Sequence, residues 1–119
     1  PGEACEEENY HCNVQGNQAG EAWAALLNPV LNGGLGLYVK FKAAQLPCFN
    51  LWKLMAWGDY VTALEPCNVA CENRAILRER GELPMLAPGE VKEFAIEIGV
   101  LEGMDEAKSF RQKIMEAAV

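Results

Sequence analysis

Apolar and polar residues alternate strictly in two stretches of the chain. In residues 35–41 every second side chain is apolar: Leu35, Leu37, Val39 and Phe41. In residues 91–100 the same spacing recurs: Phe94, Ile96, Ile98 and Val100. Because successive side chains of a strand point to opposite faces, this pattern is typical of a β-strand with one buried face. The alternation therefore predicts two half-buried strands.

Three further stretches predict strands with less regular alternation. Residues 21–28 are mainly apolar and precede a loop that contains a proline and two glycines. Residues 49–57 and 60–65 are rich in aromatic and aliphatic side chains and flank Gly58 and Asp59. Two such stretches around a two-residue break indicate a β-hairpin. We therefore expect the chain to turn at Gly58-Asp59.

Two segments predict helices. Residues 71–81, "CENRAILRERG", are mostly good helix formers and end at a glycine. Residues 104–117 place four apolar side chains on one helical stripe: Met104, Ala107, Phe110 and Ile114. Acidic residues begin this second segment, and Arg111 and Lys113 come late, which suits the helix dipole. We predict a short helix after the strand that ends at Glu65, and a C-terminal helix.

Together these elements predict a mainly β protein with an antiparallel sheet and two helices. The chain has 119 residues, which is enough for one modest domain. We therefore expect a single domain over residues 1–119. Five or six strands and two helices could form a small α+β domain, or they could be one part of a larger sandwich.

Charge and hydropathy exclude several classes of partner. The net charge is −7, and no stretch concentrates Lys and Arg without acids among them. We therefore expect no nucleic-acid partner and no anionic membrane surface. No apolar run approaches the ~18 residues that a membrane-spanning helix needs. The N-terminal residues lack the basic start and apolar stretch of a signal peptide, so we expect a cytoplasmic protein.

The chain has five cysteines: Cys5, Cys12, Cys48, Cys67 and Cys71. An odd number is typical of a cytoplasmic protein whose thiols are reduced. Cys67 and Cys71 are separated by three residues, whereas zinc sites usually pair cysteines across two residues or add histidine ligands. His11 is the only histidine. We therefore expect no metal site and no cofactor.

Glu65 is the residue of greatest chemical interest, because its strand-face neighbours Val61 and Ala63 are apolar. A turn at Gly58-Asp59 would place Trp52 directly opposite Glu65 on the same face. A carboxylate beside an indole ring suits a sugar, since the carboxylate accepts hydroxyl hydrogen bonds and the ring covers apolar C–H groups. The same register places Lys53 on the opposite face.

A structural interpretation of these residues is also open. Glu65 could be solvated or could pair with a nearby arginine such as Arg74. Trp52 could belong to the core, and His11 could be a surface residue. Asn68 could cap the helix that follows it.

The order and spacing of several short motifs resemble those of a known family. The motifs include "ALLNP", "GLGLYVKF", "QLP", "LEPCN", "LAPGE" and "EIGVL". In this order they resemble the C-terminal third of an uncharacterised aldose-1-epimerase-like family in the galactose mutarotase-like superfamily. The resemblance covers nearly the whole chain and is weakest over residues 1–11. It implies a truncated galactose mutarotase-like domain, that is, part of an antiparallel β-supersandwich.

The resemblance also implies roles for six residues. Mutarotases interconvert the anomers of aldoses, with a glutamate as base and a histidine as acid, and Glu65 matches the base. Trp52 and Lys53 match the segment that contacts the sugar. Asn68 and Arg74 match positions that would orient Glu65. The acid of the family lies upstream of the matched region, and spacing to "ALLNP" favours a sugar contact over the acid role for His11.

Three functions follow from these expectations. The chain could be an active aldose 1-epimerase-like isomerase, or a protein that binds an aldose or its derivative without turnover. It could instead be a non-catalytic structural remnant that folds as a homo-oligomer. Cutting a supersandwich exposes apolar faces and strand edges, so we expect a homo-oligomer. Catalytic competence requires an acid in place of the missing histidine, so we expect carbohydrate binding first.

Overall fold

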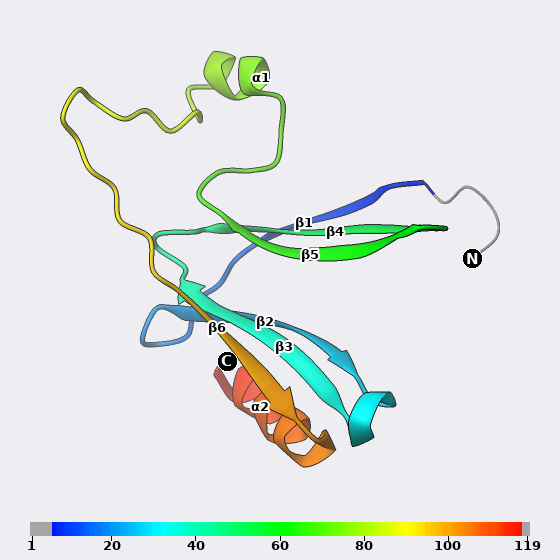
Figure 1. Cartoon of the computed structure of the whole chain (residues 1–119). Helices are drawn as coiled ribbons and strands as arrows, with labels where there is room; N and C mark the ends of the chain where they lie inside the picture. The colour runs from blue at the N-terminus through cyan, green and yellow to red at the C-terminus, as the bar shows by residue number, and fades with distance from the viewer. Residues whose placement is uncertain (1–5, 118–119) are drawn as a thin grey trace. The chain divides into compact units, whose positions relative to one another are not determined.

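A computed structural model of the chain describes residues 6–117 and divides the chain into two compact units (Figure 1). The first unit comprises residues 1–14 and 46–93, and the second comprises residues 15–45 and 94–119. Each unit is built on one three-stranded antiparallel sheet. The prediction that the units form a single domain stays a prediction.

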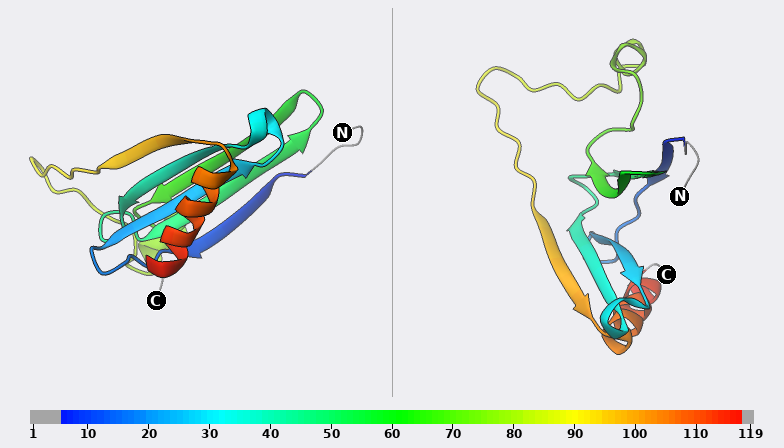
Figure 2. Two further views of the ribbon diagram at one scale, coloured as in Figure 1. Left: turned by 90° about the horizontal axis from the view of Figure 1, so that it is seen from below. Right: turned by 45° about the vertical axis from the view of Figure 1, so that its right-hand side comes forward.

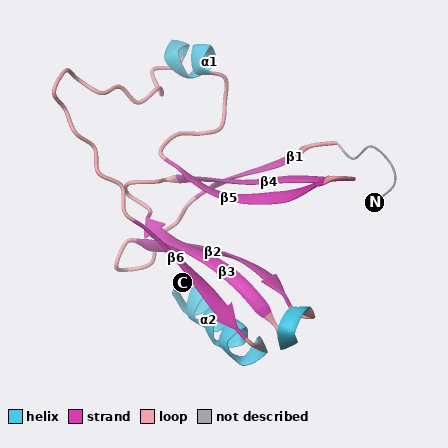
Figure 3. Ribbon diagram, in the orientation of Figure 1, coloured by secondary structure: helices cyan, strands magenta, loops and turns pink. Residues whose placement is uncertain are grey.

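The sheet of the first unit has the order β1-β4-β5 (Figure 3). Its strands are β1 (Glu8–Asn13), β4 (Cys48–Ala56) and β5 (Asp59–Cys67). The central strand β4 pairs with β5 through a hairpin and with β1 over a long separation in sequence. The pattern of apolar and polar residues did not predict strand β1, because its sequence "ENYHCN" is polar and shows no apolar alternation.

The hairpin turns at Trp57-Gly58, so the predicted turn and its register were wrong. Ala56 pairs with Asp59, and Gly58 has a φ of 86°. Glycine tolerates this left-handed conformation best, so Gly58 takes the second turn position and Asp59 joins the strand. The register shifts by two residues, which places Asn50 rather than Trp52 opposite Glu65.

A short helix follows β5, as predicted. Helix α1 runs from Arg74–Glu79, and the Asn73 side chain caps it by accepting a hydrogen bond from the backbone N–H of Ala75 at 2.8 Å. The expectation that Asn68 could cap this helix was therefore wrong. Leu77 is the buried residue of the helix, with 2% of its surface exposed.

The sheet of the second unit has the order β2-β3-β6. Its strands are β2 (Glu21–Asn28), β3 (Leu35–Lys42) and β6 (Ile96–Glu102), with a short 3-10 helix η1 (Leu31–Gly33) between the first two. Helix α2 (Met104–Ala117) lies along one face of this sheet (Figure 2). The Tyr38 and Phe110 rings meet there, with centroids 4.8 Å apart.

The opposite face of this sheet bears the alternating apolar residues that the sequence predicted. Strand pairing places Ile96, Ile98 and Val100 opposite Phe41, Val39 and Leu37. Val39 and Phe41 are buried, but Leu37, Ile98 and Val100 are 50%, 73% and 51% exposed. This face is therefore only partly covered.

The predicted fold class is confirmed. The chain is mainly β, with two antiparallel sheets, a short helix after β5 and a C-terminal helix over the predicted residues. Strand β6 is shorter than expected, since residues 91–95 precede it as a loop. None of the described helices is long and apolar enough to cross a membrane.

Candidate functional site

Three polar side chains form a row across the sheet of the first unit. His11 of β1 is opposite Asn50 of β4, and Asn50 is opposite Glu65 of β5. Directly opposed residues of antiparallel strands project from the same face of the sheet. We call His11, Asn50 and Glu65 the polar row.

Asn50 is the centre of the polar row and the only buried polar residue among those that the structure describes, with 3% of its surface exposed. Its Nδ2 donates one hydrogen bond to Glu65 Oε2 at 2.6 Å and one to Asn9 Oδ1 at 3.3 Å. An amide nitrogen has two N–H groups, so both donors are used and the orientation of the amide is fixed.

The carbonyl oxygen of the Asn50 side chain, unlike its nitrogen, is not engaged in a hydrogen bond to the described residues. Asn50 Oδ1 is buried and has no hydrogen-bond partner within residues 6–117. A buried polar atom without a partner costs about 1–3 kcal/mol, and native proteins contain few of them. Each such atom calls for an explanation, and a bound hydrogen-bond donor would supply one.

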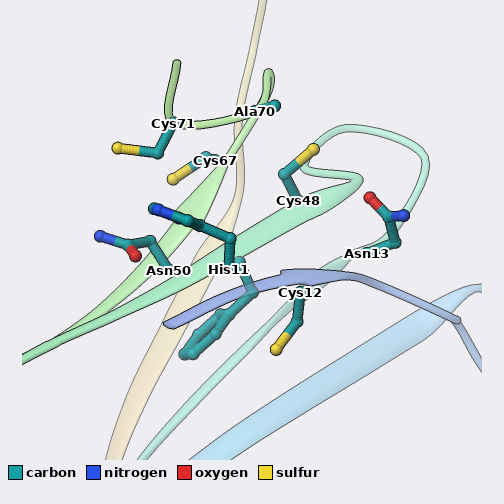
Figure 4. A pocket seen from close by; sticks show the side chains of 9 residues that line it. His11, Cys12, Asn13, Cys48, Asn50, Cys67, Ala70 and Cys71 are labelled. Carbon is teal, nitrogen blue, oxygen red and sulfur yellow. The ribbon is translucent and has the colours of Figure 1, made fainter. Parts of the chain in front are cut away.

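A pocket of about 210 Å³ lies at this end of the sheet (Figure 4). It is lined by residues of β1, β4, β5 and the loop after β5: His11, Cys12, Asn13, Cys48, Phe49, Asn50, Cys67, Ala70 and Cys71. The His11 ring and the Asn50 amide lie beside each other at its edge in this view. His11 is exposed, and no hydrogen bond or ion pair to its ring is found among the described residues.

Cys67 continues the face of Glu65 at the end of β5. Its Sγ donates to the Glu65 backbone carbonyl at 3.0 Å. The pKa of the Cys67 thiol is raised mainly by burial. The nearby Glu65 carboxylate and the thiols of Cys71 and Cys48 raise it further. The group is therefore a protonated thiol at neutral pH.

Trp52 lies on the face of the polar row, although not opposite Glu65. Its partner on β5 is Ala63, which makes Trp52 a diagonal neighbour of Glu65. The indole Nε1 donates to Glu7 Oε1 at 2.6 Å. The ring is half-buried and still shares a face with the carboxylate.

Lys53 lies on the opposite face, as the sequence predicted. Its Nζ forms an ion pair with Glu8 at 2.8 Å and lies 5.1 Å from the centroid of the Tyr10 ring. The hydrogen bond between Lys53 and Glu8 is the main cause of a raised pKa for Lys53 and a lowered pKa for Glu8. The structure therefore does not bring Lys53 together with Glu65.

Asn68 and Arg74 are exposed, one in the loop after β5 and the other at the start of α1. Across residues 6–117, no hydrogen bond or ion pair joins either of them to Glu65. The expected Arg74 to Glu65 pair is thus not formed, and Asn50 is the residue that holds Glu65. Sequence reasoning missed Asn50, although an asparagine inside the apolar segment "FNLWKLM" is unusual for a strand.

The described cysteines are free thiols: Cys12, Cys48, Cys67 and Cys71. Cys5 lies outside the described residues. Within residues 6–117, no group of three or more His, Cys, Asp or Glu side chains is arranged to hold a metal ion.

Comparison with known proteins places the chain in a family without assigning an activity. No curated protein and no solved structure matches it. One family model does match, that of a domain of unknown function, DUF4432, over residues 1–100. This match spans both sheets, including the whole polar row and strand β6 up to Val100. The chain therefore belongs to the DUF4432 family.

Proposed function

We propose that this protein binds an aldose or a related sugar at the polar row. The observation that best supports the proposal is the buried, unpartnered Oδ1 of Asn50, which lies beside the Glu65 carboxylate. Both groups accept hydrogen bonds, and a sugar presents several hydroxyl donors close together. A ligand hydroxyl that donates to Asn50 Oδ1 would satisfy it.

The other members of the site suit the same class of ligand. The Trp52 ring lies on the same face and can cover the apolar C–H groups of a sugar ring. His11 and Glu65 are two strands apart, which corresponds to about 9–10 Å across a sheet. A sugar ring that lies over the Asn50 side chain can span this distance with a hydrogen bond of ~2.8 Å at each side.

The resemblance to aldose 1-epimerases adds a role for Glu65 as a base at the anomeric hydroxyl. A base must reach the proton that it removes, and catalysis also needs an acid at the ring oxygen. His11 is the candidate for this acid, because it is the other titratable side chain of the polar row. Binding without turnover is the simpler proposal, since it needs only the acceptors and the Trp52 ring.

Titration calorimetry of the protein against a panel of aldoses tests the proposal. Glu65→Gln keeps the shape and can still accept the hydrogen bond from Asn50, but it removes the charge. Losing a hydrogen bond to a charged group costs about 1.5–3 kcal/mol, so we expect affinity to fall roughly ten- to hundredfold.

Glu82→Gln is the matched control, because Glu82 is exposed and its side chain is outside the polar row. We expect wild-type affinity from this variant. An unchanged binding constant in Glu65→Gln would contradict the proposal. A polarimetric assay of anomer exchange on the same samples then distinguishes turnover from binding alone.

The second candidate is a homo-oligomer with a structural role. It is favoured by the partly exposed apolar face of the second sheet, where Ile98 and Val100 of the edge strand β6 are 73% and 51% exposed. Edge strands and apolar faces of this kind are typical sites of pairing between copies of a chain. We propose that this face binds a second copy.

Sedimentation equilibrium over a wide range of concentrations tests this candidate. Ile98→Asp puts a charge on the face and should shift the protein towards monomer. Val91→Asp is the control, because Val91 is 80% exposed but lies in the loop before β6. A wild-type protein that is monomeric at every concentration would contradict self-association. The expected cytoplasmic location and the absence of nucleic-acid and membrane partners stay predictions.

A further inference from the structure

Three cysteines gather at one end of the first sheet. Cys48 begins β4 and Cys67 ends β5, and the two are directly opposed in the last pair of the hairpin ladder. Cys71 follows in the loop after β5, and all three line the pocket beside the polar row (Figure 4). Each of them is a free thiol in the structure.

The backbone already meets the requirement for a bond between Cys48 and Cys67. Directly opposed residues of antiparallel strands have Cα atoms about 4.5–5.5 Å apart. A disulfide needs Cα atoms about 4.4–6.8 Å apart, so the Cα spacing of this pair is compatible with a bond. Figure 4 shows the Cys48 and Cys67 sulfurs pointing away from each other, so rotation about the Cα–Cβ bonds of both residues is needed to bring the sulfurs together.

We propose that Cys48 and Cys67 are an oxidation site that forms a reversible disulfide on exposure to a peroxide. The bond would join β4 to β5 at the end of the hairpin, two residues beyond Glu65 on the same strand. This inference rests on strand pairing and on the cysteines alone, so it does not depend on sugar binding.

The chemistry balances with hydrogen peroxide as the oxidant. The Cys48 thiolate attacks one peroxide oxygen, the O–O bond breaks, and a sulfenic acid and water form after protonation. Cys67 then releases its proton to solvent, its thiolate attacks the Cys48 sulfur, and the S–O bond breaks; the leaving hydroxide takes up a proton to form a second water. Two thiols are oxidised to one disulfide, and one peroxide is reduced to two waters.

The two cysteines suit these different roles. Cys67 donates its S–H to the Glu65 carbonyl and is kept protonated by burial and by the Glu65 carboxylate. Because the thiolate is the species that reacts with peroxide, Cys67 is poorly suited to the first step. Cys48 is also half-buried, but it lies one strand further from Glu65. It is therefore assigned the first step.

Peptide mapping of the whole chain tests the proposal. The folded protein is treated at low concentration with hydrogen peroxide, remaining thiols are alkylated before unfolding, and the digest is analysed without reduction. We expect a cross-linked peptide that contains Cys48 and Cys67, with the loss of two hydrogen atoms, and its disappearance after dithiothreitol. Thiol titration should show two of the five cysteines lost.

Variants complete the test. Cys48→Ser and Cys67→Ser should each abolish the cross-link. Cys12→Ser should retain it, because Cys12 is opposite Phe49 and projects from the other face of the sheet. Circular dichroism of every variant before oxidation excludes loss of folding as the cause. A Cys67 to Cys71 bond, or oxidation of Cys71 alone with Cys48 and Cys67 still reduced, would overturn the proposal.

Discussion

Replacing Asn50 by aspartate is the sharpest structural test of the polar row. The substitution changes few atoms but exchanges the amide that donates to Glu65 for a second carboxylate. The Asn50 Nδ2 to Glu65 Oε2 distance is 2.6 Å, and Asn50 is almost fully buried. Two negative groups would therefore be held against each other where water can screen them little.

The expected cost has two parts. Losing a hydrogen bond to a charged group costs about 1.5–3 kcal/mol. Two carboxylates about 4 Å apart repel each other by about 4 kcal/mol at an effective dielectric constant of 20. Side-chain movement relieves part of the sum, so we expect Asn50→Asp to lower the free energy of unfolding by about 3–5 kcal/mol at pH 7. Domains of this size are stable by about 5–15 kcal/mol, so the variant would be marginal.

Asn50→Leu is the matched control. It also loses the hydrogen bond to Glu65, but it adds no charge and removes the unpartnered Oδ1. Removal of a buried unpaired acceptor raises the free energy of unfolding by about 1–3 kcal/mol. This gain offsets the loss of the hydrogen bond, which is about 1.5–3 kcal/mol. We therefore expect Asn50→Leu to change the free energy of unfolding by only about 1 kcal/mol.

The pH dependence separates repulsion from a packing defect. In folded Asn50→Asp, one proton shared by two carboxyl groups relieves the repulsion, so the folded state binds a proton more tightly than the unfolded state. Stability relative to wild type should therefore rise as pH falls from about 7 to about 4, because the unfolded carboxyl groups titrate near pH 4. Asn50→Leu should show no such recovery.

Urea denaturation followed by tryptophan fluorescence, at several pH values, measures these differences. Equal losses in both variants, without pH dependence in Asn50→Asp, would refute the reasoning. That result would mean that Asn50 and Glu65 are not held in contact in solution. The proposed site would then lose the geometry on which it depends.

Three further predictions test other parts of the structure. Lys40→Met should raise the pKa of Glu21 towards its ordinary value, because a hydrogen bond from Lys40, at 3.1 Å, is the main cause of its lowering. A carbon-detected NMR titration of Glu21 would show this. In the wild-type protein the contribution of the pair to stability is lost as pH falls through the lowered pKa of Glu21, so the stability of Lys40→Met should fall less steeply over the same pH range. Asn73→Ala should destabilise the protein by about 1 kcal/mol in thermal unfolding through loss of the α1 cap. Gly99→Ala should lower the free energy of unfolding by about 1–3 kcal/mol in the same assay, because the added methyl group would overlap the Tyr38 ring. For Asn73→Ala and for Gly99→Ala, an unchanged melting temperature would contradict the prediction.

The candidate site was only half predictable from the sequence. Glu65 was identified because a carboxylate is unusual on a strand face whose preceding side chains, Val61 and Ala63, are apolar. Its partner Asn50 was not, because a lone polar residue in a strand does not reveal what faces it. The error in register arose from one glycine: the backbone of Gly58 adopts a left-handed conformation at the second turn position, and this moved every cross-strand pair by two residues.

By itself, the sequence determined the elements whose signals are local. Alternation indicated β3 and most of β6, and the stripe of apolar residues indicated α2, because each pattern reflects the geometry of a single segment. The tertiary structure alone decided that the polar segment Glu8–Asn13 forms a strand and that it pairs with β4. Pairing between segments about 40 residues apart depends on the free energy of the whole sheet rather than on local preference. Only that pairing brings His11 beside Asn50, and so completes the polar row.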